Sequence, residues 1–429
     1  MRSLFKSAPL KIHQLLRWSE RYTKTDMVYL FKGGSWLLSG NALLIIIAFA
    51  LSVAYANWLS PETYGTYRYI LSVASLLALT SLPGMKSAVS RAIALEQVST
   101  LRQGFKARVR WSLLGTAMGL AIAGYYAYQD NFVLSIGIAL VSLLFPLAEA
   151  LDLYQSFFLG KKLFHRQAIA NATTAIFQAV VICAILLIQP NNVWYLLIGF
   201  FGSEIIIHGF WWWRIKALTA SNASNAETIA YGKHLTVITT LNSALLYIDR
   251  LLVFQFIGAA QLASFVVATA PTEQLRGLVR NIQTMAMPKF TQQTAIDRQS
   301  LWYKILLFGL AIAGGTAIYI LLAPMLFTFL FPQYLSGIGY SRLFALSLPA
   351  ISVSGFVASI LEARAHRRAL YHYNVISNVI SIILLIPGLF FFGIFGLIGS
   401  RVIARYFSLA YACILCDRSL KHHEPELVS

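Results

Sequence analysis

Arginines recur inside stretches of this chain that are otherwise apolar. Arg250 lies in the apolar stretch 235–258, Arg68 begins another, and Arg401 and Arg405 are four residues apart. That spacing places the last two on one helix face. A guanidinium group donates two parallel hydrogen bonds to phosphate oxygens, so several arginines facing one cavity would suit a lipid diphosphate. We predict cavity roles for these four arginines; the alternative is that they snorkel to lipid headgroups.

Acidic residues close to these arginines could bind a coupling ion. Asp249 precedes Arg250, and the two side chains lie about 100° apart around a helix, so they cannot share one face. Glu273 follows Pro271 and stands three residues before Arg276. Glu273 could carry a proton, or it could form a structural pair with Arg276. Asp249, Glu273 and Arg276 are therefore assigned to ion coupling, by a proton or sodium ion, or to helix pairing.

Two further groups of polar residues have simpler interpretations. Glu204 and His208 are four residues apart and could relay protons, although a single histidine in such a place more often packs. Glu149 and Asp152 come shortly before the basic turn 161–162, which favours a structural role. None of these residues is assigned to a substrate site.

The cysteines do not indicate a metal site or covalent chemistry. Cys413 and Cys416 have a two-residue spacing but no second cysteine pair or histidines nearby, so we interpret them as packing residues. We predict no catalytic residue, metal site or cofactor. Arg342 lies beside a short linker, where snorkelling is the favoured interpretation. Gly115 and Gly119 predict close helix packing.

The elements that position these residues follow from composition. The chain is 58% hydrophobic and 12% charged, with mean hydropathy +0.67, whereas soluble proteins carry roughly a quarter charged residues. The apolar residues come in runs of about 20, the length of a membrane-spanning helix. The chain is therefore predicted to be an all-α polytopic membrane protein. The net charge of +18 could indicate nucleic acid binding, but the basic residues lie between apolar runs, as topology signals do.

About twelve apolar runs are predicted to span the membrane. Alternate linkers carry most of the Lys and Arg, whereas the linkers between them carry none. The positive-inside rule then places both termini in the cytoplasm. The predicted spans are 33–57, 67–88, 111–128, 132–158, 168–188, 193–213, 235–257, 261–286, 301–323, 341–361, 371–392 and 395–416.

The spans fall into two pseudo-symmetric halves of six. The outer turn WLSPETYGTY matches FIGAAQLASF at the same place in the second half, which predicts a parallel repeat. The predicted segments are a basic N-terminal segment, which could form an interfacial helix, an N-terminal six-helix lobe, a cytoplasmic linker, a C-terminal six-helix lobe and a cytoplasmic tail. Their respective bounds are 1–32, 33–213, 214–234, 235–416 and 417–429.

Four segments resemble one family of transporters. They are LSPETYGTYRYILSV after the first span, YIDRLLVFQFIGAAQLASFVVATAP across the seventh and eighth, MAMPKF and LFPQYLSG. The chain is similar to the polysaccharide biosynthesis transporters, the Wzx-type flippases of lipid-linked oligosaccharides. These belong to the multidrug/oligosaccharidyl-lipid/polysaccharide exporter superfamily. The resemblance implies two lobes around a central cavity, alternating access and an undecaprenyl-diphosphate-linked glycan as substrate.

The expected function is therefore a flippase in the bacterial inner membrane, serving surface polysaccharide assembly (O-antigen, capsule or exopolysaccharide). The expected partners are the lipid-linked glycan, membrane lipids and other polysaccharide-assembly proteins, and no nucleic acid. One alternative is a multidrug or small-molecule exporter, which would need more buried acids to bind cations. Another is a membrane glycan polymerase or ligase, which the short outer linkers disfavour. The sequence holds no P-loop, so ATP hydrolysis by this chain is not expected.

Overall fold

The computed structural model describes residues 27–216, 226–292, 298–363 and 367–421, and these are almost entirely helical, without a strand. Large apolar side chains cover the outside of the bundle: Ile188, Leu321 and Phe391 are 78%, 76% and 78% exposed. A water-soluble bundle would bury such residues, whereas lipid solvates them. The predicted all-α membrane protein is confirmed.

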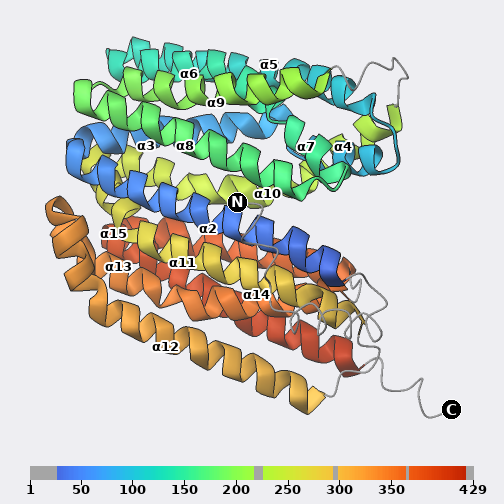
Figure 1. Ribbon diagram of the computed structural model, residues 1–429. Helices are drawn as coiled ribbons and strands as arrows, with labels where there is room; N and C mark the ends of the chain where they lie inside the picture. The colour runs from blue at the N-terminus through green and yellow to red at the C-terminus, as the bar shows by residue number, and fades with distance from the viewer. Residues whose placement is uncertain (1–26, 217–225, 293–297, 364–366, 422–429) are drawn as a thin grey trace, which may run out of the picture.

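The first half of the chain forms one layer of helices, drawn uppermost in Figure 1. Their bounds are α2 (Met27–Trp58), α3 (Pro61–Leu77), η1 (Ala78–Ser81), α4 (Met85–Ala94), α5 (Thr100–Tyr128), α6 (Phe132–Leu151), α7 (Tyr154–Gly160), α8 (Phe164–Ile188) and α9 (Val193–Lys216). Ser60 caps α3 by accepting a hydrogen bond from the Thr63 amide, and Pro61 starts the helix without needing an amide donor.

Most of the second half forms the lower layer. Its bounds are α10 (Ala226–Phe256), α11 (Ala259–Gln292), α12 (Arg298–Leu330), η3 (Pro332–Gly337), α13 (Ile338–Ala345), α14 (Ser347–Ala363) and α15 (Arg367–Lys421). Helix α10 lies among the helices of the first half in Figure 1. Gly393 breaks α15 with a φ of 59° and a ψ of −140°, a conformation that glycine alone adopts readily. This break falls between the predicted spans 371–392 and 395–416.

Seven helices are long and apolar enough to cross a membrane, or eight if the pair α3–η1 and α4, bent by 46°, counts as one span. The test covers only the described residues, and one of the seven, His372–Arg418, contains two predicted spans. The predicted number of about twelve therefore stays a prediction, as do the segment boundaries.

Helices α2 and α10 each pack on helices of both halves. Helix α2 packs on α8 of its own half and also on α11, whereas α10 packs on α3 and α4 as well as on α15. Helices α3 and α11 run against each other where the layers meet. Each half therefore contributes one long helix that packs against the other half.

The halves close against each other at one end, which we call the seam. The Asn57 side chain donates to the Leu330 carbonyl at 2.8 Å, and the Tyr69 ring stacks on Phe254 at 3.9 Å between centroids. Gly65 lies so close to the Ala259 backbone that a side chain at this position would overlap it. The seam thus depends on backbone-to-backbone packing, hydrogen bonds and aromatic contact.

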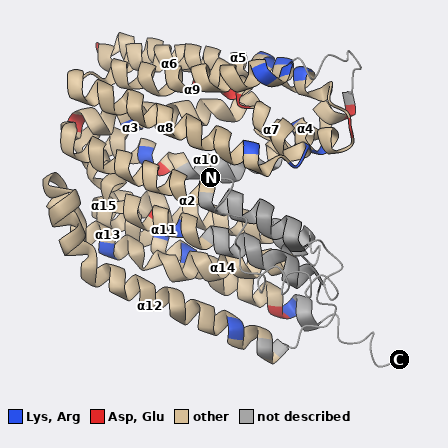
Figure 2. Ribbon diagram, in the orientation of Figure 1, with Lys and Arg blue, Asp and Glu red and all other residues tan. Residues whose placement is uncertain are grey.

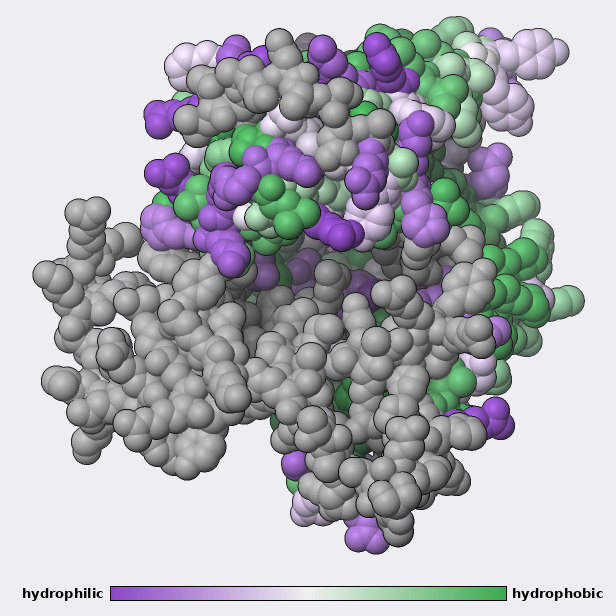
Figure 3. Space-filling view, turned by 90° about the vertical axis from the view of Figure 1, so that its right-hand side faces the viewer, coloured by the Kyte–Doolittle hydropathy of each residue, from purple (hydrophilic) through white to green (hydrophobic). Residues whose placement is uncertain are grey.

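Basic residues gather at the other end of the bundle, on the right in Figure 2. Figure 3 looks onto this end and shows hydrophilic side chains over the first half, with hydrophobic side chains along one flank. Helix α2 begins and α15 ends at this basic end (Figure 1). The alternation of basic and uncharged linkers in the sequence therefore corresponds to a segregation of basic residues at one end of the bundle.

Candidate functional site

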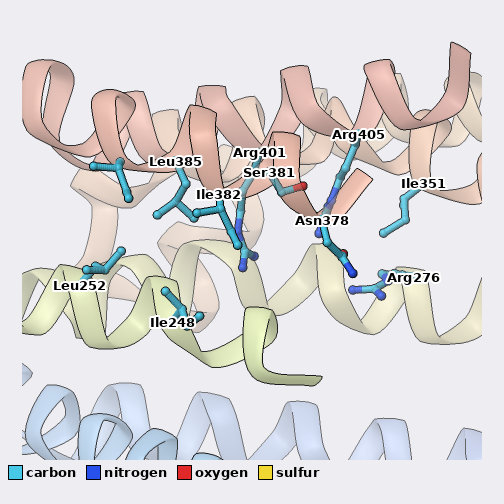
Figure 4. Close-up of a pocket in the computed structure, with 11 residues that line it drawn as sticks. Ile248, Leu252, Arg276, Ile351, Asn378, Ser381, Ile382, Leu385, Arg401 and Arg405 are labelled. Carbon is cyan, nitrogen blue, oxygen red and sulfur yellow. The ribbon is translucent and has the colours of Figure 1, made fainter. Parts of the chain in front are cut away.

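A cavity of about 310 Å³ lies between α10, α11, α14 and α15. Figure 4 shows Arg401, Arg405 and Asn378 projecting from α15 toward α10 and α11, with Arg276 opposite them on α11. Its apolar lining comes mainly from Ile and Leu side chains of α10 and α15. The cavity therefore combines a hydrophobic wall with three guanidinium groups.

Asp249 holds one of these arginines. Its Oδ2 lies 2.6 Å from Nη2 of Arg401, and the aspartate is only 1% exposed. Asp249 also accepts a hydrogen bond from the Arg250 amide at 2.9 Å. As expected from the 100° helical step, Asp249 turns toward α15 while the Arg250 side chain points elsewhere. Asp249 therefore pairs two helices, and a coupling role for it stays a prediction.

Glu273 joins two other arginines of the cavity. One carboxylate oxygen lies 3.0 Å from Nη1 of Arg276 and the other 3.5 Å from Nη2 of Arg405. Arg405 also donates to the Ser347 hydroxyl at 2.5 Å. A carboxylate shared by two guanidinium groups is held in its charged form. This geometry favours the pairing interpretation of Glu273; its predicted coupling role has not been tested.

Arg68 and Arg250 form a separate pair beside the seam. Arg68 comes from α3 in the first half and Arg250 from α10 in the second, and each is close enough for its charge to act on the other. Neither makes an ion pair with a described residue; Arg250 lies over the Tyr247 ring at 5.9 Å. The Arg68 Nε is buried without a hydrogen-bond partner. The two guanidinium groups therefore repel each other, and no described carboxylate forms an ion pair with either of them.

The four predicted arginines thus fall into two places rather than one. Arg401 and Arg405 line the cavity, whereas Arg68 and Arg250 lie beside the seam and outside the cavity lining. Together with Arg276, five guanidinium groups lie near only two carboxylates, those of Asp249 and Glu273. The region is therefore strongly cationic.

Sequence reasoning missed several polar residues of the cavity. Asn378 and Ser381 line the cavity and stand three residues apart on α15. Ser347, the first residue of α14, lies outside the lining but accepts a hydrogen bond from Arg405. The available signal was their polarity at a helix-face spacing inside an apolar run. Many packed serines share that pattern, so it could not single them out.

A second cavity, of about 350 Å³ and almost wholly apolar, lies between α2, α11 and α12. Its lining residues are Ile45, Ile46, Phe49, Ala50, Pro271, Gln274, Leu275, Leu278, Tyr319 and Leu326. At about 100° per residue, the α11 members of this set lie on the face opposite Glu273 and Arg276. We call it the apolar groove. One helix therefore separates a cationic cavity from an apolar groove.

Glu149 and Asp152 pair with Arg108 and Lys86, as their predicted structural role requires. Arg108, just before the predicted span 111–128, is fully buried inside α5. It stays there because it donates to Glu149 at 2.5 Å and to the Ser81 carbonyl at 3.0 Å.

Gly115, Gly119, Arg342 and the two C-terminal cysteines can also be located in the structure. Gly115 and Gly119 face η1 and α6 closely, which confirms the predicted packing. Arg342 is exposed at the periphery and donates to the Ile320 carbonyl at 3.1 Å. Cys416 is buried in an apolar cluster with Cys413 packed against it. Among the described residues, no group of His, Cys, Asp or Glu could hold a metal ion.

Comparison with known proteins defines the family. Residues 30–294 match the polysaccharide biosynthesis protein family. A search of curated proteins finds no match. Among solved structures, the chain is similar to an inward-facing multidrug resistance MATE transporter of the MOP superfamily, with TM-score 0.65, 12% identity and coverage of 92% of this chain and 100% of that one.

Two further structures share the fold. The lipid II flippase MurJ in an inward closed conformation has TM-score 0.65 and 14% identity, over 90% of this chain and 87% of that one. A MOP superfamily transporter from Pyrococcus furiosus, described as having a binding pocket of reverse polarity, has TM-score 0.60 and 12% identity, over 91% and 96%. At these identities the likeness shows a common fold. With the family match covering most of the chain, this protein belongs to the polysaccharide biosynthesis family and has the fold of the MOP superfamily transporters.

Proposed function

We propose that this protein is a flippase that moves a diphosphate-linked glycan lipid across the cell membrane by alternating access. The observation that carries the proposal is that Arg68 and Arg250, one from each half, act on each other's charge while neither guanidinium makes an ion pair with a described residue. Two arginine forks match the oxygens of a diphosphate better than a single charge does. An anion held by both would link substrate binding to the relative position of the halves.

The cationic cavity extends this site. Arg401 and Arg405 are already held by Asp249 and Glu273, so their charges are partly neutralised. They would contribute to the long-range attraction of an anionic head, while Asn378 and Ser381 offer hydrogen bonds to a glycan. We therefore assign binding of the diphosphate to Arg68 and Arg250, and binding of the polar parts of the head group to the cavity.

The apolar groove supports a lipid-linked substrate over a soluble one. It lies on the opposite face of α11 from Glu273 and Arg276 and is lined almost entirely by hydrocarbon. A prenyl chain could occupy this groove while its head lies on the other side of the helix. A water-soluble drug has no hydrocarbon chain to place in the apolar groove. The excess of guanidinium groups likewise disfavours a cation exporter, which would need acids at its centre.

The positive-inside rule supports a cytoplasmic location for the basic end in a bacterial inner membrane. Loading would then occur from the cytoplasmic side, since the seam closes the opposite end. Partners that make the lipid-linked glycan or use it after translocation would follow from this direction of transport.

Binding of defined lipids to purified protein in nanodiscs tests the proposal. Undecaprenyl diphosphate should bind more tightly than undecaprenyl monophosphate, and the uncharged alcohol least. A charge-assisted contact contributes about 1.5–3 kcal/mol, so Arg68→Ala or Arg250→Ala should each weaken diphosphate binding roughly tenfold to a hundredfold. Arg250→Lys should fall between, because lysine keeps the charge but loses the fork.

Arg342→Ala is the matched control, since it removes the same charge from the exposed periphery. It should leave binding unchanged. The proposal is wrong if Arg68→Ala and Arg250→Ala fold normally yet bind the diphosphate as tightly as Arg342→Ala.

A further inference from the structure

The first half of the chain contains a half-buried polar cluster that substrate binding does not use. It joins five helices and consists of Lys86 on α4, Arg108 on α5, Glu149 on α6, Asp152 in the turn between α6 and α7, Tyr154 on α7, and Glu204 and His208 on α9. We call it the α9 cluster. It lies in the layer opposite the cationic cavity.

Two carboxylates of the α9 cluster are neutralised. Glu149 pairs with Arg108 at 2.5 Å and also lies 3.4 Å from the Ser81 hydroxyl. Asp152 pairs with Lys86, whose side chain is 41% exposed. Both cations are therefore occupied, and neither is free to serve a third acid.

Glu204 is that third acid. It makes no ion pair with any described residue, and the Gln178 amide on α8, which lies near it, donates to the Phe200 carbonyl at 3.5 Å. The charged groups that act on it most strongly are Glu149 and Asp152, which are both acidic. An ionised carboxylate at membrane depth beside like charges is costly, and it is relieved by a proton or a cation.

His208 supplies an independent sign of a missing proton or ligand. It is only 7% exposed, its Nδ1 has no hydrogen-bond partner, and Asp152 and Glu149 act on its charge. It follows Glu204 by one helical turn, toward the basic end, and its ring lies 5.4 Å from that of Tyr154. Asp152 in turn pairs with Lys86, whose side chain is 41% exposed.

We propose that Glu204 is the proton-coupling site of the transporter and that His208 and the Lys86–Asp152 pair connect it to water at the basic end. A proton fits better than a metal ion, because no group of acidic, His or Cys side chains among the described residues is arranged to hold one. Glu273 is the poorer candidate, because two arginines already hold its charge. This inference rests on the transport function proposed above, but proton binding itself does not require a substrate.

Infrared difference spectroscopy of the purified, substrate-free protein provides the test. Raising the pH should remove a carboxylic acid C=O band in the wild type, and this band should be missing in Glu204→Gln. Glu273→Gln is the matched control: it removes another partly buried membrane carboxyl, but one held as a carboxylate, and should leave the band in place. Glutamine keeps the shape of glutamate, but Glu273→Gln leaves Arg276 and Arg405 without their carboxylate. Thermal unfolding of both variants is therefore measured first, and the spectra are compared for protein that is folded.

Transport in proteoliposomes gives the second measurement. Glu204→Gln should abolish the dependence of flipping on a proton gradient while leaving binding of the diphosphate lipid unchanged. Lipid binding by the Arg68 and Arg250 variants tests the proposed transport function, and its outcome does not depend on the result for Glu204. An unchanged C=O band in Glu204→Gln, or a band lost in Glu273→Gln instead, would overturn the assignment.

Discussion

Closing of the seam depends on a position where no side chain fits. Gly65 on α3 lies against the backbone of Ala259, the first residue of α11, and a Cβ at this position would fall well inside contact distance of the Ala259 carbonyl oxygen. Backbone cannot move aside as a flexible side chain can. Gly65→Ala should therefore push the two halves apart at the seam and favour the state that is open at this end.

The size of the effect follows from overpacking. Inserting a methyl group into a close contact costs about 1–3 kcal/mol. At about 1.4 kcal/mol per factor of ten, the ratio of seam-closed to seam-open protein should fall roughly 5- to 150-fold. Alanine also favours a helix over glycine by about 0.5–1 kcal/mol, but this gain is the same in both states and leaves their ratio unchanged.

Distance measurements between spin labels test this prediction. Labels at Glu62 and Leu335, exposed positions on opposite halves at this end, would report opening as a longer distance, after replacement of the three native cysteines. Gly124→Ala on α5 is the matched control, because nothing lies within 4 Å of its Cβ. If Gly65→Ala gives the same distance distribution as Gly124→Ala, the seam does not depend on this contact.

Two further predictions concern stability and orientation. Asp249→Ala should lower the free energy of unfolding by up to about 3–5 kcal/mol, because it leaves the Arg401 side chain, only 18% exposed, without its partner. Asp249→Leu combined with Arg401→Met should recover most of this loss in thermal unfolding of the detergent-purified protein, and no recovery would show that the pair does more than satisfy charge. Cysteines placed at Asn131, Asn191 and Ser336 should react with an impermeant thiol reagent in whole cells. Cysteines placed at Glu96 and Lys162 should not react. The reverse pattern would show that the proposed topology is inverted.

The sequence determined the class of protein and much of its local structure. Length and hydropathy suffice for this, because a bilayer accepts only helices of sufficient apolar length whose backbone groups are internally paired. Ser60 and Pro61 mark the start of α3, and Gly393 marks the break in α15, because caps and glycine conformations are properties of the local chain. The segregation of basic residues to one end could also be predicted, since it follows from the alternation of linkers.

Tertiary structure alone decided which charges meet. Asp249 could be seen to face away from Arg250, but only the packing of α10 against α15 brought it to Arg401. The same holds for Arg108, which is buried with Glu149, and for Glu204, which is left without a cation. Helical periodicity fixes which residues share a face, whereas the rotation of each helix and its neighbours come from side-chain packing between segments far apart in the sequence. A charge becomes a ligand, a structural pair or a proton site only through that packing.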